Sequence, residues 1–118
     1  MQLTLEHDFD YILAGGGLQA GLLVLALRHY RPTASVLVVE RGHAFGGNHT
    51  WSFHRGDIPA AAQTWIRHLP THNWEAYHVR FPKYERLVEL EYATTTSRAF
   101  AEVIHQHLPA DERHASRL

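Results

Sequence analysis

A short apolar segment that runs into a glycine-rich turn constrains this chain more than any other feature. Residues 10–14 predict a buried strand, residues 15–17 are three consecutive glycines, and an uninterrupted helical pattern covers residues 18–30. A second apolar run, residues 35–40, ends in an acid. This order of strand, glycine turn, helix and acid-ended strand is typical of a βαβ unit that binds a dinucleotide.

Each part of the pattern has a mechanical reason. Gly15 allows the tight turn, Gly17 lets the backbone approach a pyrophosphate, and the small Ala20 lets the helix pack closely on the strand. Glu40 can accept hydrogen bonds from the two ribose hydroxyls of an adenosine, and Arg41 lies beside it. The alternative is a glycine turn that only packs a helix against a strand and binds nothing.

Composition narrows the function classes. With 118 residues the chain is long enough for one domain, and its net charge of −1 gives no electrostatic footprint for nucleic acid. It has no cysteine, which excludes disulfides and thiolate metal sites and fits a cytoplasmic location. Residues 1–8 do not resemble a secretory signal, and the apolar run 22–27 is far shorter than the roughly 20 residues that cross a bilayer. Any membrane contact is therefore expected to be peripheral.

Beyond residue 40 the pattern predicts a loop over 41–57, a short helix over 59–69 capped by Asp57, and an antiparallel hairpin of strands 74–81 and 85–92. Ser97 is expected to cap a last helix that buries Phe100, Val103, Ile104 and Leu108 and stops at Pro109.

The predicted fold class is α/β, a Rossmann-type βαβ unit followed by a helix, a hairpin and a helix. Strands 10–14 and 35–40 are apolar without alternation, which predicts that both faces of their sheet are covered. Residues 110–118 show no apolar run that could supply a third parallel strand, so the domain is expected to be incomplete.

A second motif, residues 41–54, follows the acid-ended strand. Gly46 and Gly47 permit close approach of backbone to a planar or anionic ligand, while Asn48, His49 and Thr50 supply hydrogen-bonding groups at the same place. The plain alternative is a surface loop with a turn.

Several segments together resemble the bacterial lycopene β-cyclases. They are the glycine turn, the acid-ended strand, Gly-Gly-Asn-His-Thr-Trp-Ser-Phe-His at 46–54, the stretch 77–82, and Thr-Thr-Thr-Ser at 94–97, in order along residues 10–108. The resemblance implies a flavoprotein with a Rossmann-type FAD domain and a separate substrate domain, which converts the linear ψ end groups of lycopene to β-ionone rings. The reaction has no net redox change, is thought to need reduced flavin, with NAD(P)H as candidate reductant, and takes a substrate that dissolves in membranes.

The resemblance also assigns cofactor-binding roles by position. The FAD pyrophosphate would lie on the glycine turn, the ribose on the acid, the adenine near the following arginine, and the flavin near the second motif. The residues are Gly15, Gly17, Leu18, Gln19, Ala20, Glu40, Arg41, Gly46, Gly47, Asn48, His49 and Thr50. No catalytic residue is assigned, because the acids implicated in cyclisation lie downstream of the region that matches.

The same residues allow other interpretations. His43, His49 and His54 share one loop, but their spacing does not predict a metal site. Another FAD-dependent enzyme of the same fold, of the monooxygenase or prenyl reductase type, remains an alternative, as does a non-catalytic remnant that binds nucleotide weakly. The sequence is interpreted as the N-terminal FAD-binding portion, residues 1–118, of a larger flavoprotein, without its substrate domain and inactive alone. Its expected location is cytoplasmic, peripheral on the inner face of the membrane; its oligomeric state stays open.

Overall fold

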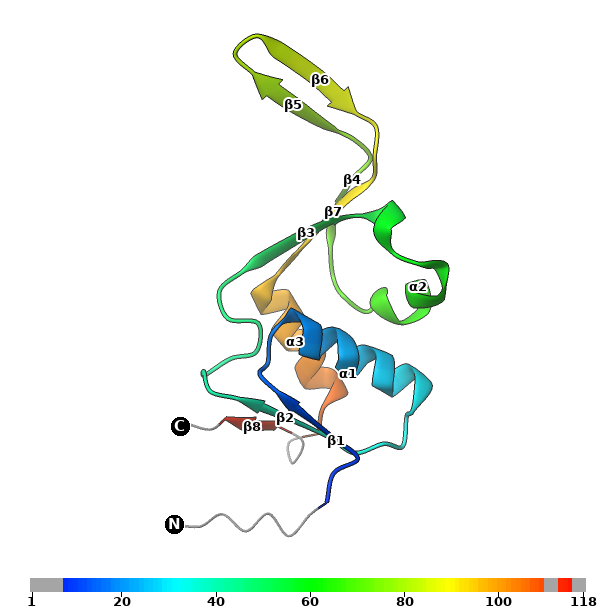
Figure 1. Cartoon of the computed structure of the whole chain (residues 1–118), viewed down its shortest axis with the longest axis vertical. Helices are drawn as coiled ribbons and strands as arrows, with labels where there is room; N and C mark the ends of the chain where they lie inside the picture. The colour runs from blue at the N-terminus through cyan, green and yellow to red at the C-terminus, as the bar shows by residue number, and fades with distance from the viewer. Residues whose placement is uncertain (1–7, 110–112, 116–118) are drawn as a thin grey trace.

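A computed structural model describes residues 8–109 and 113–115 and shows an α/β chain with three small sheets (Figure 1). The first sheet is parallel, in the order β1-β2-β8, with β1 at Tyr11–Ala14, β2 at Val36–Glu40 and β8 at Arg113–Ala115. Helix α1 at Leu18–Tyr30 connects β1 to β2 and has the bounds that the sequence predicts. The predicted βαβ unit is therefore present.

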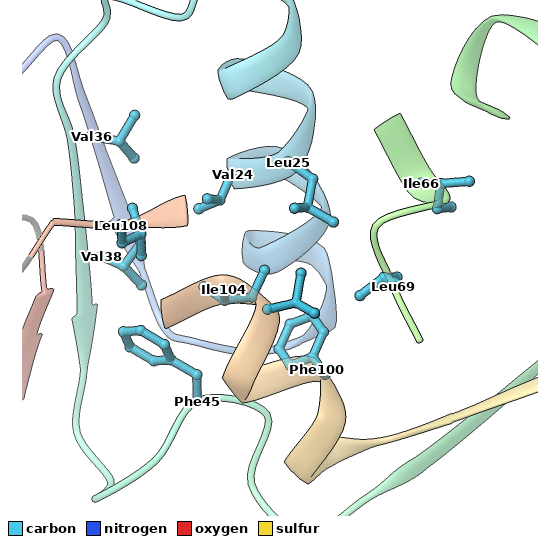
Figure 2. Packing of buried hydrophobic residues seen from close by; sticks show 11 residues of the cluster. Val24, Leu25, Val36, Val38, Phe45, Ile66, Leu69, Phe100, Ile104 and Leu108 are labelled. Carbon is cyan, nitrogen blue, oxygen red and sulfur yellow. The ribbon is translucent and has the colours of Figure 1, made fainter. Parts of the chain in front are cut away.

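The core lies between the first sheet and the helices α1 and α3, where α3 spans Ser97–His107 (Figure 2). Phe100, Val103, Ile104 and Leu108 are all buried there, as their helical spacing predicts. They meet Val24 and Leu25 of α1 and Val36 and Val38 of β2. Within the described ranges, no helix combines the length and apolarity needed to cross a membrane.

A second, antiparallel sheet has the order β3-β7-β4. Its strands are β3 at Thr50–His54, β7 at Tyr92–Thr96 and β4 at His72–Trp74, and between β3 and β4 lie a short 3-10 helix at Arg55–Asp57 and helix α2 at Ala60–Ile66. The expected loop over 41–57 is therefore wrong from Thr50 onward. Trp51 and Phe53 alternate with Thr50, Ser52 and His54, and this period of two is the signal that could have identified β3.

The third sheet is a hairpin that projects from the rest of the molecule (Figure 1). Strands β5 at Tyr77–Phe81 and β6 at Tyr84–Val88 pair around Pro82 and Lys83, which confirms the predicted hairpin. Its outer ends differ from the prediction, because Trp74 and Tyr92 belong to β4 and β7 of the second sheet. The chain is consequently elongated, with principal extents of 62, 31 and 17 Å.

Both predicted helix caps are wrong. Helix α3 is capped by Thr96, whose side-chain oxygen accepts a hydrogen bond from the Ala99 N–H at 3.2 Å, one residue before the expected Ser97. Pro59 is the N-cap of α2, and Asp57 lies in the preceding 3-10 helix. Ser97 is instead the first residue of α3, where its N–H donates to the His49 carbonyl at 2.8 Å and ties the helix to the loop before β3.

Two predictions about the parallel sheet are also wrong. A third strand does exist, because β8 pairs with β2 through backbone hydrogen bonds that need no apolar run. Residues 110–112 and 116–118 of the same predicted tail lie outside the described residues. The sheet is also not covered on both faces at β1, because Leu13 packs against the core while Ile12, on the opposite face, is 64% exposed.

Thr95 on β7 carries a buried hydroxyl with no hydrogen-bond partner. Replacing it in Thr95→Val removes that unpaired group at nearly constant volume, so the free energy of unfolding in urea should stay equal or rise by about 1 kcal/mol. The matched control is Thr94→Val on the same strand, where the hydroxyl contacts Ser52 Oγ at 2.8 Å. That substitution should lower stability, and a Thr95→Val protein less stable than Thr94→Val would contradict the expectation.

Candidate functional site

The three glycines between β1 and α1 form a turn with an open helix start. Gly15 has a φ of +93°, which favours glycine, and its N–H donates to the Val39 carbonyl at 2.7 Å. Gly17 is the N-cap of α1 and has no side chain to accept from the first N–H groups of that helix. A Cβ at Gly15 or Gly17 would have no heavy atom within 4 Å. The turn therefore presents backbone donors to an open space.

Glu40, at the end of β2, is hydrogen-bonded to this turn. Its Oε2 accepts from the Gly16 N–H at 2.6 Å and its Oε1 from the Gly42 N–H at 2.8 Å. The backbone hydrogen bonds from Gly42 and then Gly16 lower the pKa of Glu40, and the charge of Arg41 acts in the same direction. Glu40 is thus an ionised acceptor at neutral pH, held beside the glycine turn.

The second glycine motif meets the first. The Gly46 N–H donates to the Gly16 carbonyl at 2.6 Å, and Gly46 and Gly47 have φ values of +82° and +61°. Gly46 is buried: a Cβ there would stand 2.8 Å from Phe100 Cδ1 and 3.2 Å from the Trp51 ring. Two segments that are far apart in sequence therefore form one backbone cluster at the carboxyl ends of β1 and β2.

A hollow of about 460 Å³ lies over the glycine turn. It is bounded by the end of β1, the turn and the first turns of α1, and five predicted site residues line it: Gly15, Gly17, Leu18, Gln19 and Ala20. Gly46 adjoins the other side of the turn through Gly16. These five residues, from the glycine turn and the first turn of α1, therefore share one space.

The remaining predicted residues lie further out. Arg41, Asn48 and Thr50 are exposed, and Thr50 pairs with Thr96 at the start of β3. His49 packs its ring 5.9 Å from that of Trp51, next to Gly47. None of these four residues lines the hollow.

The arrangement suits an anionic ligand with hydroxyl groups. A helix N-terminus without a capping side chain attracts negative charge, and the open Cβ positions leave room for phosphate against backbone. The Gly16 N–H is already used by Glu40, so the donors left for phosphate are those at the start of α1. The residues present thus fit a dinucleotide pyrophosphate and its ribose.

Sequence reasoning missed two contacts, one at the glycine turn and one at the far end of β3. Phe45 is 6% exposed and packs its ring against Gly16, stacked 5.1 Å from His105 of α3. His54 contacts Tyr77, with Nε2 3.0 Å from the phenol oxygen. Among residues 8–109 and 113–115, no three histidine, aspartate or glutamate side chains gather as a metal site would require.

Glu40 should make stability depend on pH. Its pKa is lower in the folded chain than its ordinary value of 4.5, so its contribution is complete above that value and is lost as pH falls through the folded pKa. In Glu40→Gln, the loss of unfolding free energy between pH 6 and pH 3 should be smaller than in the parent. Urea titrations at each pH measure the unfolding free energy, and Glu89→Gln, at an exposed position, is the control. If the parent and both variants lost the same unfolding free energy between pH 6 and pH 3, Glu40 would not be the source of the pH dependence.

Comparison with known proteins places the chain in one family. Residues 10–117 match the family described as lycopene cyclase protein. The chain is 43% identical over 99 residues to the lycopene beta-cyclase of Pseudescherichia vulneris, covering 84% of this chain and 26% of that relative. For Pantoea ananas lycopene beta-cyclase the identity is 39% over 102 residues, covering 86% and 27%. A third relative, from Paracoccus sp., is 35% identical over 95 residues, covering 80% and 25%.

The three relatives match this chain over similar lengths. The chain spans about a quarter of the length of the curated relatives it matches. The family match over residues 10–117 includes both the glycine turn and the second glycine motif. The chain therefore belongs to the lycopene cyclase family.

Proposed function

We propose that this chain is the FAD-binding portion of a lycopene β-cyclase, in which it holds the flavin cofactor for the conversion of ψ end groups to β-ionone rings. The site would bind the FAD pyrophosphate at the start of α1 and the adenosine ribose at Glu40. The second glycine motif would lie toward the flavin. Other parts of a longer protein would supply the substrate domain and the acid.

One observation carries this proposal. The backbone of Gly16 links both motifs, because its N–H donates to Glu40 and its carbonyl accepts from the Gly46 N–H. A glycine turn that only packed a helix would not need the acid of the next strand and a second glycine pair in the same cluster. Because both contacts are made by Gly16, they favour a single ligand that runs past the turn, the acid and the second motif.

The remaining parts of the proposal follow from the substrate. A carotenoid dissolves in membranes, so a protein that cyclises it would act at the bilayer surface as a peripheral protein on the cytoplasmic side. Bound FAD would supply the reduced flavin that the resemblance implies, and NAD(P)H is the proposed reductant. The overall reaction is an isomerisation.

The test compares this chain alone with a fusion in which it replaces the matching segment of the Pantoea ananas lycopene beta-cyclase. Both are expressed in lycopene-accumulating cells, and the pigments are separated by chromatography. We expect the fusion to form β-carotene and the 118-residue chain alone to form none above a vector control. Proton chemistry requires a positioned acid and an enclosed substrate pocket, and the proposal assigns both to other parts of the longer protein.

Two results would contradict the proposal. Cyclic carotenoid formed by the chain alone would show that catalysis needs far less of the protein. A fusion that binds FAD but yields a product of changed oxidation level would instead favour an oxidoreductase of the monooxygenase or prenyl reductase type.

A further inference from the structure

The second sheet has one buried face and one open face. Ala93 and Thr95 of β7 point to the buried face, where they are at most 1% exposed. Because side chains alternate along a strand, Tyr92 points the other way. Its register partners are His54 of β3 and Trp74 of β4, so three rings stand in one row across the open face.

Tyr77, at the start of the hairpin, joins this row. Its ring is stacked on His54 with centroids 5.8 Å apart and lies 5.3 Å from the Tyr92 ring. Its phenol oxygen is 3.0 Å from His54 Nε2. Trp74 lies 6.0 Å from Tyr92 and is 49% exposed. We call these four residues, His54, Trp74, Tyr77 and Tyr92, the aromatic row.

The hairpin continues the row as an apolar strip. Tyr77, Val79 and Phe81 share one face of β5, and Tyr84 lies opposite Phe81 on the same face. Phe81 is 64% and Tyr84 56% exposed. Arg86, opposite Val79, is the charged member of this face.

The other face of the hairpin holds its ion pairs. Glu85 lies 3.0 Å from Arg80 and 3.3 Å from His78. Apart from Arg86, the charged side chains of the two hairpin strands lie on the face opposite the rings, where Leu87 is also exposed. An isolated two-stranded hairpin gains little from exposing aromatic side chains to water, so an exposed apolar strip of this kind marks a binding surface.

We propose that the aromatic row and the strip bind the conjugated chain of the carotenoid substrate, a step that rests on the proposed function and assigns to this chain one wall of a substrate site whose enclosure and acid other parts of the longer protein would supply. A polyene is long, flat and without polar groups, and ring faces offer it apolar contact along its length. With strands about 4.8 Å apart and a rise of about 3.3 Å per residue, row and strip together extend on the order of 20 Å.

The position and charge of the surface favour this occupant. β3 runs directly from the second glycine motif to His54, a span of about 13 Å. The row therefore stands within one short strand of the proposed flavin end. A bilayer fits less well, because Glu75 and Glu91 outnumber Arg55 around the hollow beside Trp74 and Tyr92 and would repel anionic lipid.

The experiment uses the purified 118-residue chain with lycopene dispersed in a neutral detergent. Lycopene is achiral, so a circular dichroism band in its visible absorption arises only when a chiral surface holds it. We expect a saturable induced band. A Tyr77→Ser, Tyr92→Ser double variant should weaken the apparent affinity at least 10-fold, whereas Tyr77→Phe, which keeps the ring, should bind within 3-fold of the parent.

Tyr30→Ser is the matched control, because Tyr30 is 58% exposed on α1 and lies outside the row. It should not change the band. Far-ultraviolet circular dichroism checks that each variant is folded, and if the double variant unfolds, Trp74→Ala replaces it with the same expectation. No induced band with the parent, or equal loss of the band in Tyr30→Ser and the double variant, would overturn the proposal.

Three further measurements distinguish a carotenoid from other ligands of this surface and test the proposed function separately. Co-sedimentation with anionic vesicles that is lost in the double variant would assign the surface to a bilayer, and a monomer–dimer shift lost in that variant would assign it to a second copy; either overturns the carotenoid assignment. FAD titration of the same samples tests the cofactor site independently. FAD binding without lycopene binding would overturn the substrate surface alone.

Discussion

A Gly17→Val variant of the fusion protein should fold and lose FAD. Gly17 has an ordinary φ of −80°, and a Cβ there meets no heavy atom within 4 Å, so the fold has room for the side chain. The same space is where a pyrophosphate would contact the backbone. Displacing two charge-assisted hydrogen bonds of about 1.5–3 kcal/mol each would weaken binding by at least about 100-fold.

The matched control is Gly56→Val, because Gly56 also has open space around its Cβ position and lies away from the turn. Gly17 is a helix N-cap, where valine is disfavoured, so a loss of about 1 kcal/mol in unfolding free energy is expected and does not count against the test. Flavin absorbance after gel filtration measures retention of the cofactor. A folded Gly17→Val protein with stoichiometric FAD would remove the turn from the site.

Gly21→Ala should destabilise the chain by about 1–3 kcal/mol, although alanine is the better helix former. Gly21 is buried in α1 where α3 crosses it, and a Cβ would come closer than 3.0 Å to the Phe100 ring. Phe100 is 0% exposed, so its ring has no free space to move into. The overpacking cost therefore exceeds the gain of about 1 kcal/mol in helix propensity.

A double-mutant cycle tests the cause. Phe100→Leu shortens the side chain that would clash, so Gly21→Ala should cost less in the Phe100→Leu background than in the parent. Urea denaturation of the four proteins gives the coupling. Additive effects of the two substitutions would show that the cost of Gly21→Ala arises elsewhere in α1.

Local pattern was enough wherever the deciding interactions are close in sequence. Helix α1 has the predicted bounds, and α3 buries the four residues whose spacing predicts it. The hairpin forms around Pro82 and Lys83 as expected. Each of these elements is specified by periodicity and turn residues within about a dozen positions.

Prediction failed where a neighbour distant in sequence decides the outcome. β8 is a strand because β2 supplies its backbone partner, and Ile12 of β1 is exposed because only the face that carries Leu13 packs against the core. Thr96, not Ser97, caps α3, and the Ser97 N–H instead donates to the carbonyl of His49. None of these partners is visible in the local pattern.

The candidate site divides in the same way. The sequence by itself determined the βαβ unit, the start of α1, and the two glycine-rich segments that hold Gly15, Gly17, Gly46 and Gly47. Turn geometry and periodicity are properties of neighbouring residues, so local pattern is enough to predict them. Only the tertiary structure brought Gly46 to the Gly16 carbonyl, Glu40 to the Gly16 N–H and Tyr77 to His54. Such contacts depend on how sheets and helices pack across the whole chain, and residue types alone do not encode which distant groups will meet.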